Sequence, residues 1–428
     1  MKRRSWLVLL AVVLGVVAAT FAATASSKPA KRSAGKIEVL SLWGGSEKDA
    51  FLKVTKAFTQ KTNIDVEYTT ARDFVPVIRT RLAAGNPPEV AIIPRPGVLS
   101  DLAKQGAVKN LGSMGLSSSY MKARYGPAWI KLGTVNGKLY GVAAKANSKS
   151  VMWYRPDQFK KYKVKVPKTW AQLVALTKAL KAKGATPWAQ GAKDSWTLTD
   201  WFENVYARTA GPTKYSGLFS GKVKFTDPTV KRAIQQMLQI LNNRYLAGGV
   251  QGALGTGFVD GIGRVFGANA KAQLYMEGGF VGGIATQQVN TNLKPGKTIN
   301  SFPWPTISPK YDSPMVGGGD LAAAFKDNAD VRSFLKYISS PEAGTIWVST
   351  GAIVSPNKQV KSTAYPNLLV RAEARQVAGA KVFLFDGSDL LPGSLADDWG
   401  AVLQNAMQKP SSISSLLSDF QKKADKTF

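Results

Sequence analysis

The sequence predicts an α/β fold in which helices cover both faces of a mainly parallel sheet. Apolar runs with strand character alternate with segments whose apolar residues recur at helical spacing. The 428 residues are also 44% hydrophobic, which is enough to bury one large core or two smaller ones. Three predicted strands come first: KIEVLSLW (36–43), NIDVEYTT (63–70) and PEVAIIP (88–94).

The helices between these strands have recognisable starts and apolar faces. Ser46, with Asp49 three residues later, has the spacing of a helix N-terminus, and apolar residues then recur from Ala50 to Phe58. A second helix fits Phe74 to Ala84. Because strands and helices alternate here, this part of the chain is predicted to form one α/β lobe.

The middle of the chain predicts a crossing to a second, more helical part. The segment from Asn136 to Phe159 contains a turn and two short apolar runs, and its stretch 143–150 holds only small and polar residues. We interpret that stretch as the crossing between lobes. Downstream, Thr169 and Gln172 have capping-box spacing before a helix that stops at Gly184.

The first residues predict export from the cytoplasm. Three adjacent cations precede an apolar run from Trp6 to Phe21, which ends in Ala-Thr-Ala at 23–25. The run is short for a membrane span, so a cleaved signal peptide over 1–25 is favoured over an anchoring helix. Residues 26–36 are polar and basic and predict a flexible spacer. We expect the mature protein in the periplasm or at the extracellular cell surface.

Composition excludes several kinds of chemistry. The sequence contains no cysteine and no histidine, so thiolate and imidazole metal sites, cysteine nucleophiles and histidine-based triads are not expected. Without a cysteine after the apolar run, the lipoprotein route, which acylates such a residue, is also not expected. We expect no cofactor, no metal ion and no catalytic residue.

The formal net charge of +30 predicts attraction to anionic surfaces. Removing Lys2, Arg3 and Arg4 with the signal peptide leaves +27. Lipid headgroups or wall polymers of the envelope are candidate partners, and salt should weaken the attraction. The cations are scattered along the sequence, so no nucleic acid is expected as a partner. The alternative is that most of this charge only solvates the surface.

The glycine-rich stretch SPMVGGGDLAAAFKDN (313–328) does not fit a nucleotide-binding motif. From Gly317, the sixth position of a dinucleotide fingerprint is Ala322, and the P-loop pattern fails before Gly296 because Thr291 takes the place of its first glycine. The glycines can instead let a strand approach a polar ligand, with Asp320 accepting hydrogen bonds from sugar hydroxyls.

Several segments, taken in order, resemble the extracellular solute-binding proteins of bacterial carbohydrate ABC importers. These are GNPPEVAIIPRPGVLSDLAKQGAVKNL, VNGKLYGVAAKANSKSVMWYRPDQF, VPKTWAQLVALTKALKAKG, YMEGGFVGGI and ADVRSFLKYISSPEAGTIWVSTGAIVSPN. Within that family, TARDFVPVIRTRLAAGNPP, WTLTDWFENVYARTAGP, VGGGDLAAAFKDN and FLFDGSDLLP are most similar to the alpha-glucoside-binding branch.

This resemblance implies a monomeric receptor and not an enzyme. It implies two α/β lobes, each discontinuous in sequence and joined by crossing strands, which close on a small-molecule sugar and deliver it to the permease subunits of the importer. By this analogy one lobe contains 37–145 and 306–351, and the other contains 146–305 and 352–428.

A sugar site needs aromatic platforms for the C–H faces and polar side chains for the hydroxyls. Four candidates, Trp43, Arg72, Asp73 and Arg95, follow predicted strand ends, where open α/β sheets place ligands. The others, mainly from the resemblance, are Trp196, Trp201, Glu203, Phe280, Asp320, Phe385 and Asp386. The alternatives are core packing for the aromatic residues and a surface ion pair for Arg72 and Asp73. Lys145 departs from the family, because some members use an acidic residue near this position.

Two rival functions stay open at this point. The same fold can bind an anionic solute, such as glycerol-3-phosphate or an acidic sugar, drawn by the basic surface. A secreted glycoside hydrolase would need two carboxylates about 5 to 10 Å apart. Cleft aromatics with carboxylates favour a neutral sugar, whereas converging arginines and lysines without carboxylates favour the anion.

Overall fold

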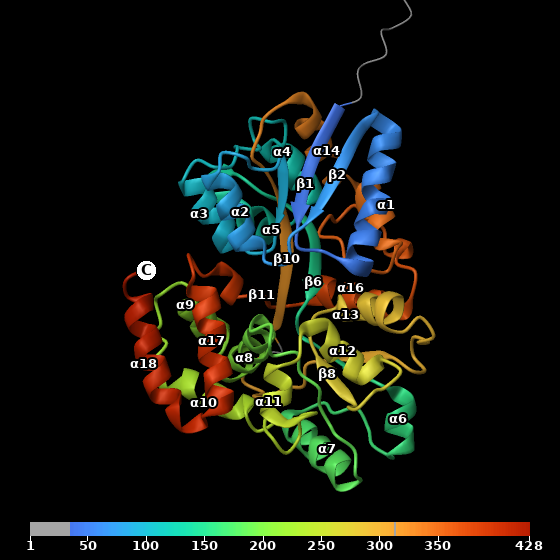
Figure 1. Cartoon of the computed structure of the whole chain (residues 1–428), viewed down its shortest axis with the longest axis vertical. Coiled ribbons are helices and arrows are strands. Elements are labelled where there is room, and N and C mark those ends of the chain that lie inside the picture. The colour runs from blue at the N-terminus through green and yellow to red at the C-terminus, as the bar shows by residue number, and fades with distance from the viewer. Residues whose placement is uncertain (1–34, 312–313) are drawn as a thin grey trace, which may run out of the picture. The chain divides into compact units, whose positions relative to one another are not determined.

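A computed structural model describes residues 35–311 and 314–428 (Figure 1). The predicted signal peptide (1–25) and most of the predicted spacer (26–36) lie outside the described residues. The first strand already begins at Gly35, so the last two residues of the predicted spacer belong to that strand. No helix within the described ranges has the length and apolarity needed to cross a bilayer.

The larger sheet has six strands in the order β11-β10-β3-β1-β2, with β6 also paired to β10. Strand β1 runs parallel to β2 and β3, and β11 runs parallel to β10, whereas β10 is antiparallel to β3 and β6. The strands are β1 (Gly35–Ser41), β2 (Ile64–Thr70), β3 (Val90–Ile93), β6 (Val142–Ser148), β10 (Met315–Ala324) and β11 (Phe383–Phe385).

The second sheet has three strands in the order β8-β7-β9, and both of its pairings are antiparallel. Its strands are β7 (Val151–Tyr154), β8 (Leu274–Met276) and β9 (Asn300–Pro303). The predicted α/β class is confirmed, but a mainly parallel sheet in each lobe is wrong for the second. Strand–helix alternation near the N-terminus predicts a parallel sheet. The second sheet is instead assembled from segments that lie far apart in the sequence. A separate hairpin joins β4 (Thr134–Val135) to β5 (Lys138–Leu139).

One hydrophobic core surrounds the β1-β2-β3 part of the larger sheet. Helix α1 contributes Phe51, Val54 and Phe58 to it, all fully buried. The predicted start of this helix is wrong in one detail, since Gly44 is the N-cap and no side chain caps the helix. The helices of this part are α1 (Gly45–Thr62), α2 (Phe74–Ala83), α3 (Pro96–Lys104), α4 (Ser118–Arg124), α5 (Pro127–Leu132), α14 (Ala329–Ile338) and α15 (Pro341–Val348).

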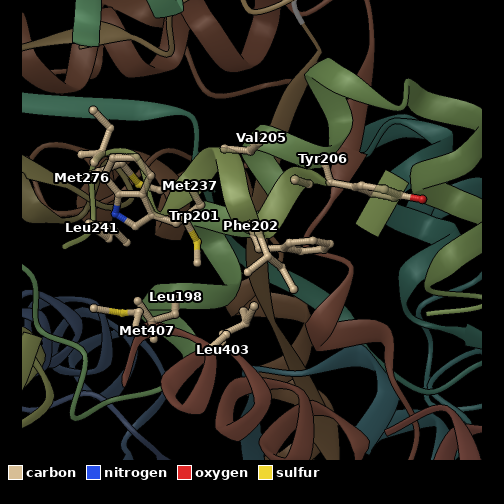
Figure 2. Close-up of a cluster of buried hydrophobic side chains, with 14 of the residues drawn as sticks. Leu198, Trp201, Phe202, Val205, Tyr206, Met237, Leu241, Met276, Leu403 and Met407 are labelled. Atoms are coloured by element: carbon tan, nitrogen blue, oxygen red, sulfur yellow. The ribbon is translucent and has the colours of Figure 1, made fainter. Parts of the chain in front are cut away.

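A second large core surrounds α8 (Trp196–Thr209), which is buried along almost its whole length. Figure 2 shows Leu198, Trp201, Phe202 and Val205 of this helix among methionine and leucine side chains from neighbouring elements. Helix α7 (Trp170–Ala182) packs on the same core, and its predicted cap is confirmed because the Thr169 hydroxyl accepts a hydrogen bond from the Gln172 N–H.

The remaining helices, many of them short, complete this part of the chain. They are α6 (Pro156–Lys161), α9 (Pro212–Leu218), α10 (Pro228–Met237), α11 (Gly249–Leu254), α12 (Phe258–Phe266), α13 (Val281–Ile284), α16 (Leu368–Gly379), α17 (Leu395–Gln408) and α18 (Ile413–Ala424). A π-helical turn spans Ala285–Val289, and 3-10 turns span Ser362–Ala364, Ser388–Leu390 and Pro410–Ser412.

Two chain segments run from one core to the other. Strand β10 places Val316 in the α8 core and Leu321 to Ala324 in the β1-β2-β3 core. The β6–β7 segment likewise has Val142 in one core and Met152 in the other. In Figure 1, β10 and β6 can be followed as long strands between the upper and lower elements. Side chains on these two strands therefore lie where the two cores meet.

Candidate functional site

A narrow crevice lies against strand β6, beside the β1-β2-β3 core and a smaller hydrophobic cluster that contains Phe258 and Val281. Its walls are Lys145, Ala146 and Asn147 of β6, together with Phe280, Ala352, Ile353 and Glu373. It encloses about 170 Å³ between atoms and leaves no room for a water molecule. A drug-sized ligand, whose pocket has roughly 300–1,000 Å³, therefore does not fit between these walls as they stand.

Lys145 forms the first charged cluster beside this crevice. Its ammonium Nζ lies 2.8 Å from a carboxylate oxygen of Glu47 and 3.3 Å from one of Asp320. The indole N–H of Trp43 donates to Asp320 at 2.9 Å, and Lys145 Nζ is 4.7 Å from the Trp43 ring centroid. We call these four residues the Lys145 cluster. The ring of Phe280 lies 5.9 Å from the same ammonium.

Local structure explains how the Lys145 cluster forms. Trp43 follows the end of β1, and Glu47 lies in the first turn of α1, where the helix dipole favours an acid. Asp320 pairs with Lys145 across β10 and β6, and the strand register shifts just after Asp320. An irregularity of this kind re-aims side chains at a sheet position.

The electrostatics of the Lys145 cluster follow from burial and pairing. Burial alone would lower the pKa of Lys145, but Glu47 and Asp320 more than compensate and raise it above its ordinary value. Burial raises the pKa of Asp320, and Lys145 opposes that shift. The cluster thus offers one ammonium donor and carboxylate acceptors at the edge of the crevice.

Lys149, four residues further along the chain, is the centre of a second buried cluster. Its ammonium contacts a carboxylate oxygen of Asp386 and lies 3.2 Å from Asp200 and 3.7 Å from Asp389. The Trp196 ring centroid is 5.6 Å from the same nitrogen. We call Lys149, Asp200, Asp386 and Asp389 the Lys149 cluster. The three acids raise the pKa of Lys149 well above its ordinary value, against the opposing effect of burial.

Carboxylates outnumber cations around Lys149, so part of this cluster is protonated near neutral pH. Burial raises the pKa of Glu277 to about 8, and a hydrogen bond with the Asp200 carboxyl group opposes that shift. Burial and the neighbouring Asp386 raise the pKa of Asp389 to about 7. Within the described residues, no N–H or hydroxyl donor reaches Asp200 Oδ2 or Glu277 Oε1, and both residues are fully buried.

Four ionic or polar contacts join the part of the chain around the β1-β2-β3 core to segments outside that core. The Arg95 guanidinium, just before α3, lies 2.8 Å from Asp397 and 3.6 Å from Asp389. The Gly393 N–H donates to Asp101 at 2.9 Å. On another side, the Ser46 N–H points at the Gln288 side chain, which extends from the π-helical turn, with a distance of 3.4 Å.

The structure brings several predicted site residues together. Trp43, Phe280 and Asp320 meet around Lys145, and Trp196 and Asp386 meet around Lys149. With no ligand present, these positions do not test the contacts, which stay predictions.

Three predicted residues lie in the interior instead. Trp201 is fully buried, donates its indole N–H to Gln190 and packs edge-on against neighbouring tryptophans. This matches the alternative of core packing given for the aromatic candidates. Glu203, also fully buried, accepts hydrogen bonds from the N–H groups of residues 387 and 388 and so supports the turn after β11. Phe385 is 9% exposed and faces the Trp129 ring.

Arg72 and Asp73 are both exposed. The described chain has no ion pair between them, so the alternative of a surface ion pair is not observed. Asp73 is the N-cap residue of α2, without a side-chain cap bond. The Arg72 guanidinium lies over Gly44, where an added Cβ would be 3.0 Å from it. The Arg72 side chain therefore lies against the residue that follows Trp43, just after the first strand.

Sequence reasoning missed Glu47, Lys149, Asp200, Glu277 and Glu373. A signal existed for some of them: Lys149 lies in the small, polar crossing KANSKS, and Glu277 follows the buried strand LYM. A charged residue in such a setting needs a partner, which indicates a buried charged network. Which partners meet there depends on contacts between distant segments.

The glycines at 317–319 have a structural role that differs from the predicted ligand approach. A Cβ at Gly319 would lie 2.5 Å from the carbonyl oxygen of Lys145, and one at Gly317 would lie 2.9 Å from that of Asn147. They let β10 pack closely against β6 and against the rings above it. Only Asp320, the residue after them, points its side chain into a polar cluster.

Comparison with known proteins agrees with this architecture. Residues 44–345 match the family model described as bacterial extracellular solute-binding protein. The osmoprotective compounds-binding protein GgtB of Synechocystis sp. is 31% identical over 84% of this chain and 85% of its own length. The alpha-glucosides-binding periplasmic protein AglE of Rhizobium meliloti is 29% identical over 82% of this chain and 79% of its own.

Solved structures have the same fold at lower sequence identity. The bacterial solute receptor AcbH superimposes with a TM-score of 0.82 at 20% identity and covers 92% of this chain and 99% of its own. Maltose-bound MalE3 of T. maritima gives 0.72 at 20% identity over 92% of this chain and 100% of its own. The fold is thus that of the two-lobed binding proteins.

The chain belongs to the bacterial extracellular solute-binding proteins. This confirms the family that the sequence resembles, which serves sugar ABC importers, and it makes the protein a solute receptor and not an enzyme.

Proposed function

We propose that the protein is an extracytoplasmic receptor that holds a neutral sugar, an alpha-linked disaccharide, between its lobes and delivers it to an ABC permease. The similarity to AglE, whose name records binding of alpha-glucosides, supports the sugar class. In this proposal the lobes are 37–145 with 306–351 and 146–305 with 352–428, as the family resemblance implies.

The observation that carries the proposal is the internal neutralisation of the cations Lys145, Lys149 and Arg95. Lys145 is paired with two carboxylates, Lys149 with three, and Arg95 with two. An anionic solute would have to displace these acids or accept their repulsion. A neutral sugar can instead donate hydroxyl hydrogens to the carboxylates and accept from the ammonium groups, so the carboxylate-rich arrangement favours it over glycerol-3-phosphate.

Aromatic rings around the same groups supply the other half of sugar recognition. Trp43 and Phe280 lie on one side, around Lys145, and Trp196 lies beside Lys149. Of these rings, Phe280 and Trp196 are partly exposed, and the two are 6.3 Å apart between centroids in an edge arrangement. Once the lobes separate, such rings can stack on the C–H faces of a pyranose.

The contacts of Arg95 and Gln288 give a mechanism for capture. In the closed arrangement Arg95 pairs with Asp397 and Asp389, and Gln288 reaches Ser46. A sugar that forms hydrogen bonds to both lobes stabilises only the closed state. It therefore shifts the population toward closure. The permease then recognises the closed receptor.

Calorimetry and thermal shift test the proposal. The exported, processed protein is titrated with trehalose, maltose, sucrose, glucose and glycerol-3-phosphate. We expect a rise in melting temperature with a neutral disaccharide, because a ligand that binds only the folded state stabilises it. Asp320→Ala should abolish the rise. Asp327→Ala, which removes an exposed ion pair with Arg332 within one lobe, is the matched control and should keep it.

Two outcomes would change the assignment. A rise only with glycerol-3-phosphate would overturn the neutral sugar and leave the receptor class standing. Release of glucose from a disaccharide during the titration would instead point to hydrolysis and contradict the receptor function.

The cellular context is part of the same proposal. We expect export with cleavage after residue 25, a monomeric protein, and an electrostatic attraction of the cationic chain to the anionic envelope. N-terminal sequencing of the exported protein and size-exclusion chromatography with light scattering test the first two.

A further inference from the structure

A strongly basic surface surrounds helices α6 and α7. Residues 155–184 contain nine cationic residues and one acid, whereas the whole chain has 57 Lys and Arg against 27 Asp and Glu. Eight lysines of this segment are exposed, and we call them the α6–α7 lysine face: Lys160, Lys161, Lys163, Lys165, Lys168, Lys178, Lys181 and Lys183. Both helices lie at the lower edge of the view in Figure 1.

Backbone contacts gather these lysines on one surface. Lys183, just after α7, donates from its ammonium to the carbonyl of Tyr162, just after α6, so the ends of the two helices meet. The Asp157 N–H donates to the Lys297 carbonyl, which brings a further loop with exposed lysines beside α6. The surface therefore extends beyond one run of sequence.

Little on the protein neutralises this face. Asp157, the one acid of the segment, is paired with Arg155 at 2.7 Å. In the part of the chain that the structure describes, none of the eight lysines forms an ion pair, whereas other exposed lysines do, among them Lys61, Lys224 and Lys326. The potential of these charges adds up outside the surface and attracts anions within about a Debye length.

The chemistry of the face fits a fluid anionic surface better than a discrete ligand. The cations are lysines, whose flexible stems act as mobile point charges, and not arginines, which recognise single phosphates in fixed geometry. Four large hydrophobic side chains are exposed in the described residues, and one of them, Val166 at 39%, lies between Lys165 and Lys168. An apolar side chain among lysines suits the interface of a lipid bilayer, where stems and valine enter the headgroup region.

We propose that the α6–α7 lysine face docks the receptor on membranes rich in anionic phospholipid. The lysines are attracted to the negative headgroups, and Val166 inserts at their boundary. None of these residues lines the crevice, so docking leaves the sugar site free. A receptor held at the surface of the membrane meets its permease by diffusion in two dimensions. This inference does not depend on which solute is bound.

Sedimentation with vesicles tests the docking face. The exported, processed protein is mixed with phosphatidylcholine vesicles that contain 0, 25 or 50% phosphatidylglycerol at several salt concentrations. The test variant carries Lys160→Gln, Lys165→Gln and Lys168→Gln. The control carries Lys104→Gln, Lys122→Gln and Lys138→Gln, which remove the same charge from exposed lysines of the other part of the chain.

We expect binding that rises with phosphatidylglycerol and falls with salt. Each lysine near an anionic membrane changes the partition coefficient by about fivefold, so the test variant should bind about 100-fold more weakly. The control variant should bind as the wild type does, and Val166→Ser should weaken binding even at high salt. Equal melting temperatures and sugar affinities in all variants show that the fold and the sugar site are intact.

Three results would overturn the proposal. Equal losses in the test and control triple variants would mean that only net charge matters. Absence of binding to vesicles with 50% phosphatidylglycerol at low salt would exclude a lipid partner. Tighter binding to a soluble polyglycerol phosphate than to vesicles of the same phosphate concentration would identify a wall-type polymer as the occupant instead.

Discussion

Removing the Arg95 guanidinium is predicted to weaken sugar binding while leaving the stability of the ligand-free protein nearly unchanged. Arg95 follows β3, beside one core, and its partners Asp389 and Asp397 belong to the segment that packs on the other. In the proposed function the two parts of the chain separate to admit the sugar and then close on it, and the Arg95 pairs join segments that separate. They therefore contribute only to the closed state.

The size of the effect follows from the geometry of the pairs. The Arg95 and Asp389 side chains are 20% and 17% exposed, with 3.6 Å between the charged atoms. Asp397 is closer, at 2.8 Å, but its side chain is 61% exposed, so solvent screens that pair. Together we assign them about 1–2 kcal/mol, which corresponds to about a 5- to 30-fold increase in Kd for Arg95→Ala.

The assay compares Arg95→Ala with a matched variant inside one lobe. Arg81 and Glu38 are both 21% exposed, with 2.6 Å between the charged atoms, and both belong to the β1–α2 region. Arg81→Ala should lower the free energy of unfolding in urea and leave the Kd unchanged. Arg95→Ala should raise the Kd measured by calorimetry and leave the unfolding curve of the ligand-free protein nearly unchanged.

The reverse pattern of effects would contradict a role of the Arg95 pairs in closure of the lobes. If Arg95→Ala lowers the stability of the ligand-free protein as much as Arg81→Ala does, and the Kd stays the same, the pairs exist in the open state too. An equal effect of both variants on the Kd would also reject it, because the change would then not depend on contacts between lobes.

Three further predictions concern the site, its protonation and the core. Trp43→Phe keeps an aromatic ring but removes the N–H that donates to Asp320 at 2.9 Å, and it should weaken sugar binding by about tenfold in calorimetry; an unchanged Kd would contradict the role of Trp43. Burial raises the pKa of Glu277 to about 8 from 4.5, so the folded state keeps a proton that the unfolded state releases, and stability falls as pH rises between about 4.5 and 8. Urea unfolding at pH 5, 6.5 and 8 should show this fall, and Glu277→Gln should reduce its slope by up to about 1.4 kcal/mol per pH unit; identical slopes would show that the carboxyl ionises normally. Phe202→Ala, in the core of Figure 2, should cost about 3–5 kcal/mol of unfolding free energy, and a loss below about 1 kcal/mol would mean that the site is loosely packed.

Local sequence signals predicted the elements near the N-terminus well. The strands at 36–43, 63–70 and 88–94 and the helix from Phe74 are present, because a buried strand or an amphipathic helix has its own period. The second lobe was predicted less well. Its sheet joins β7, which ends at Tyr154, to β8 and β9, which begin at Leu274 and Asn300, and no periodicity reports their antiparallel pairing.

The candidate site divides in the same way. Trp43 and Asp320 were found because one follows a strand end and the other follows a conspicuous glycine run. Trp201 and Glu203 were also predicted at the site, but both are fully buried side chains of α8. One turn of a buried helix has both a crevice side and a core side, and aromatic residues occur on either.

The sequence alone determined the class of protein: the absence of cysteine and histidine, the strand–helix alternation and the ordered family segments are all properties of the linear chain. The tertiary structure decided which charges meet. Lys145 and Lys149 lie four residues apart, yet their carboxylates come from positions 47, 200, 320, 386 and 389. A buried charge is stable only beside opposite charges, and the partners that reach it are chosen by how distant strands and helices pack, which a local pattern cannot encode.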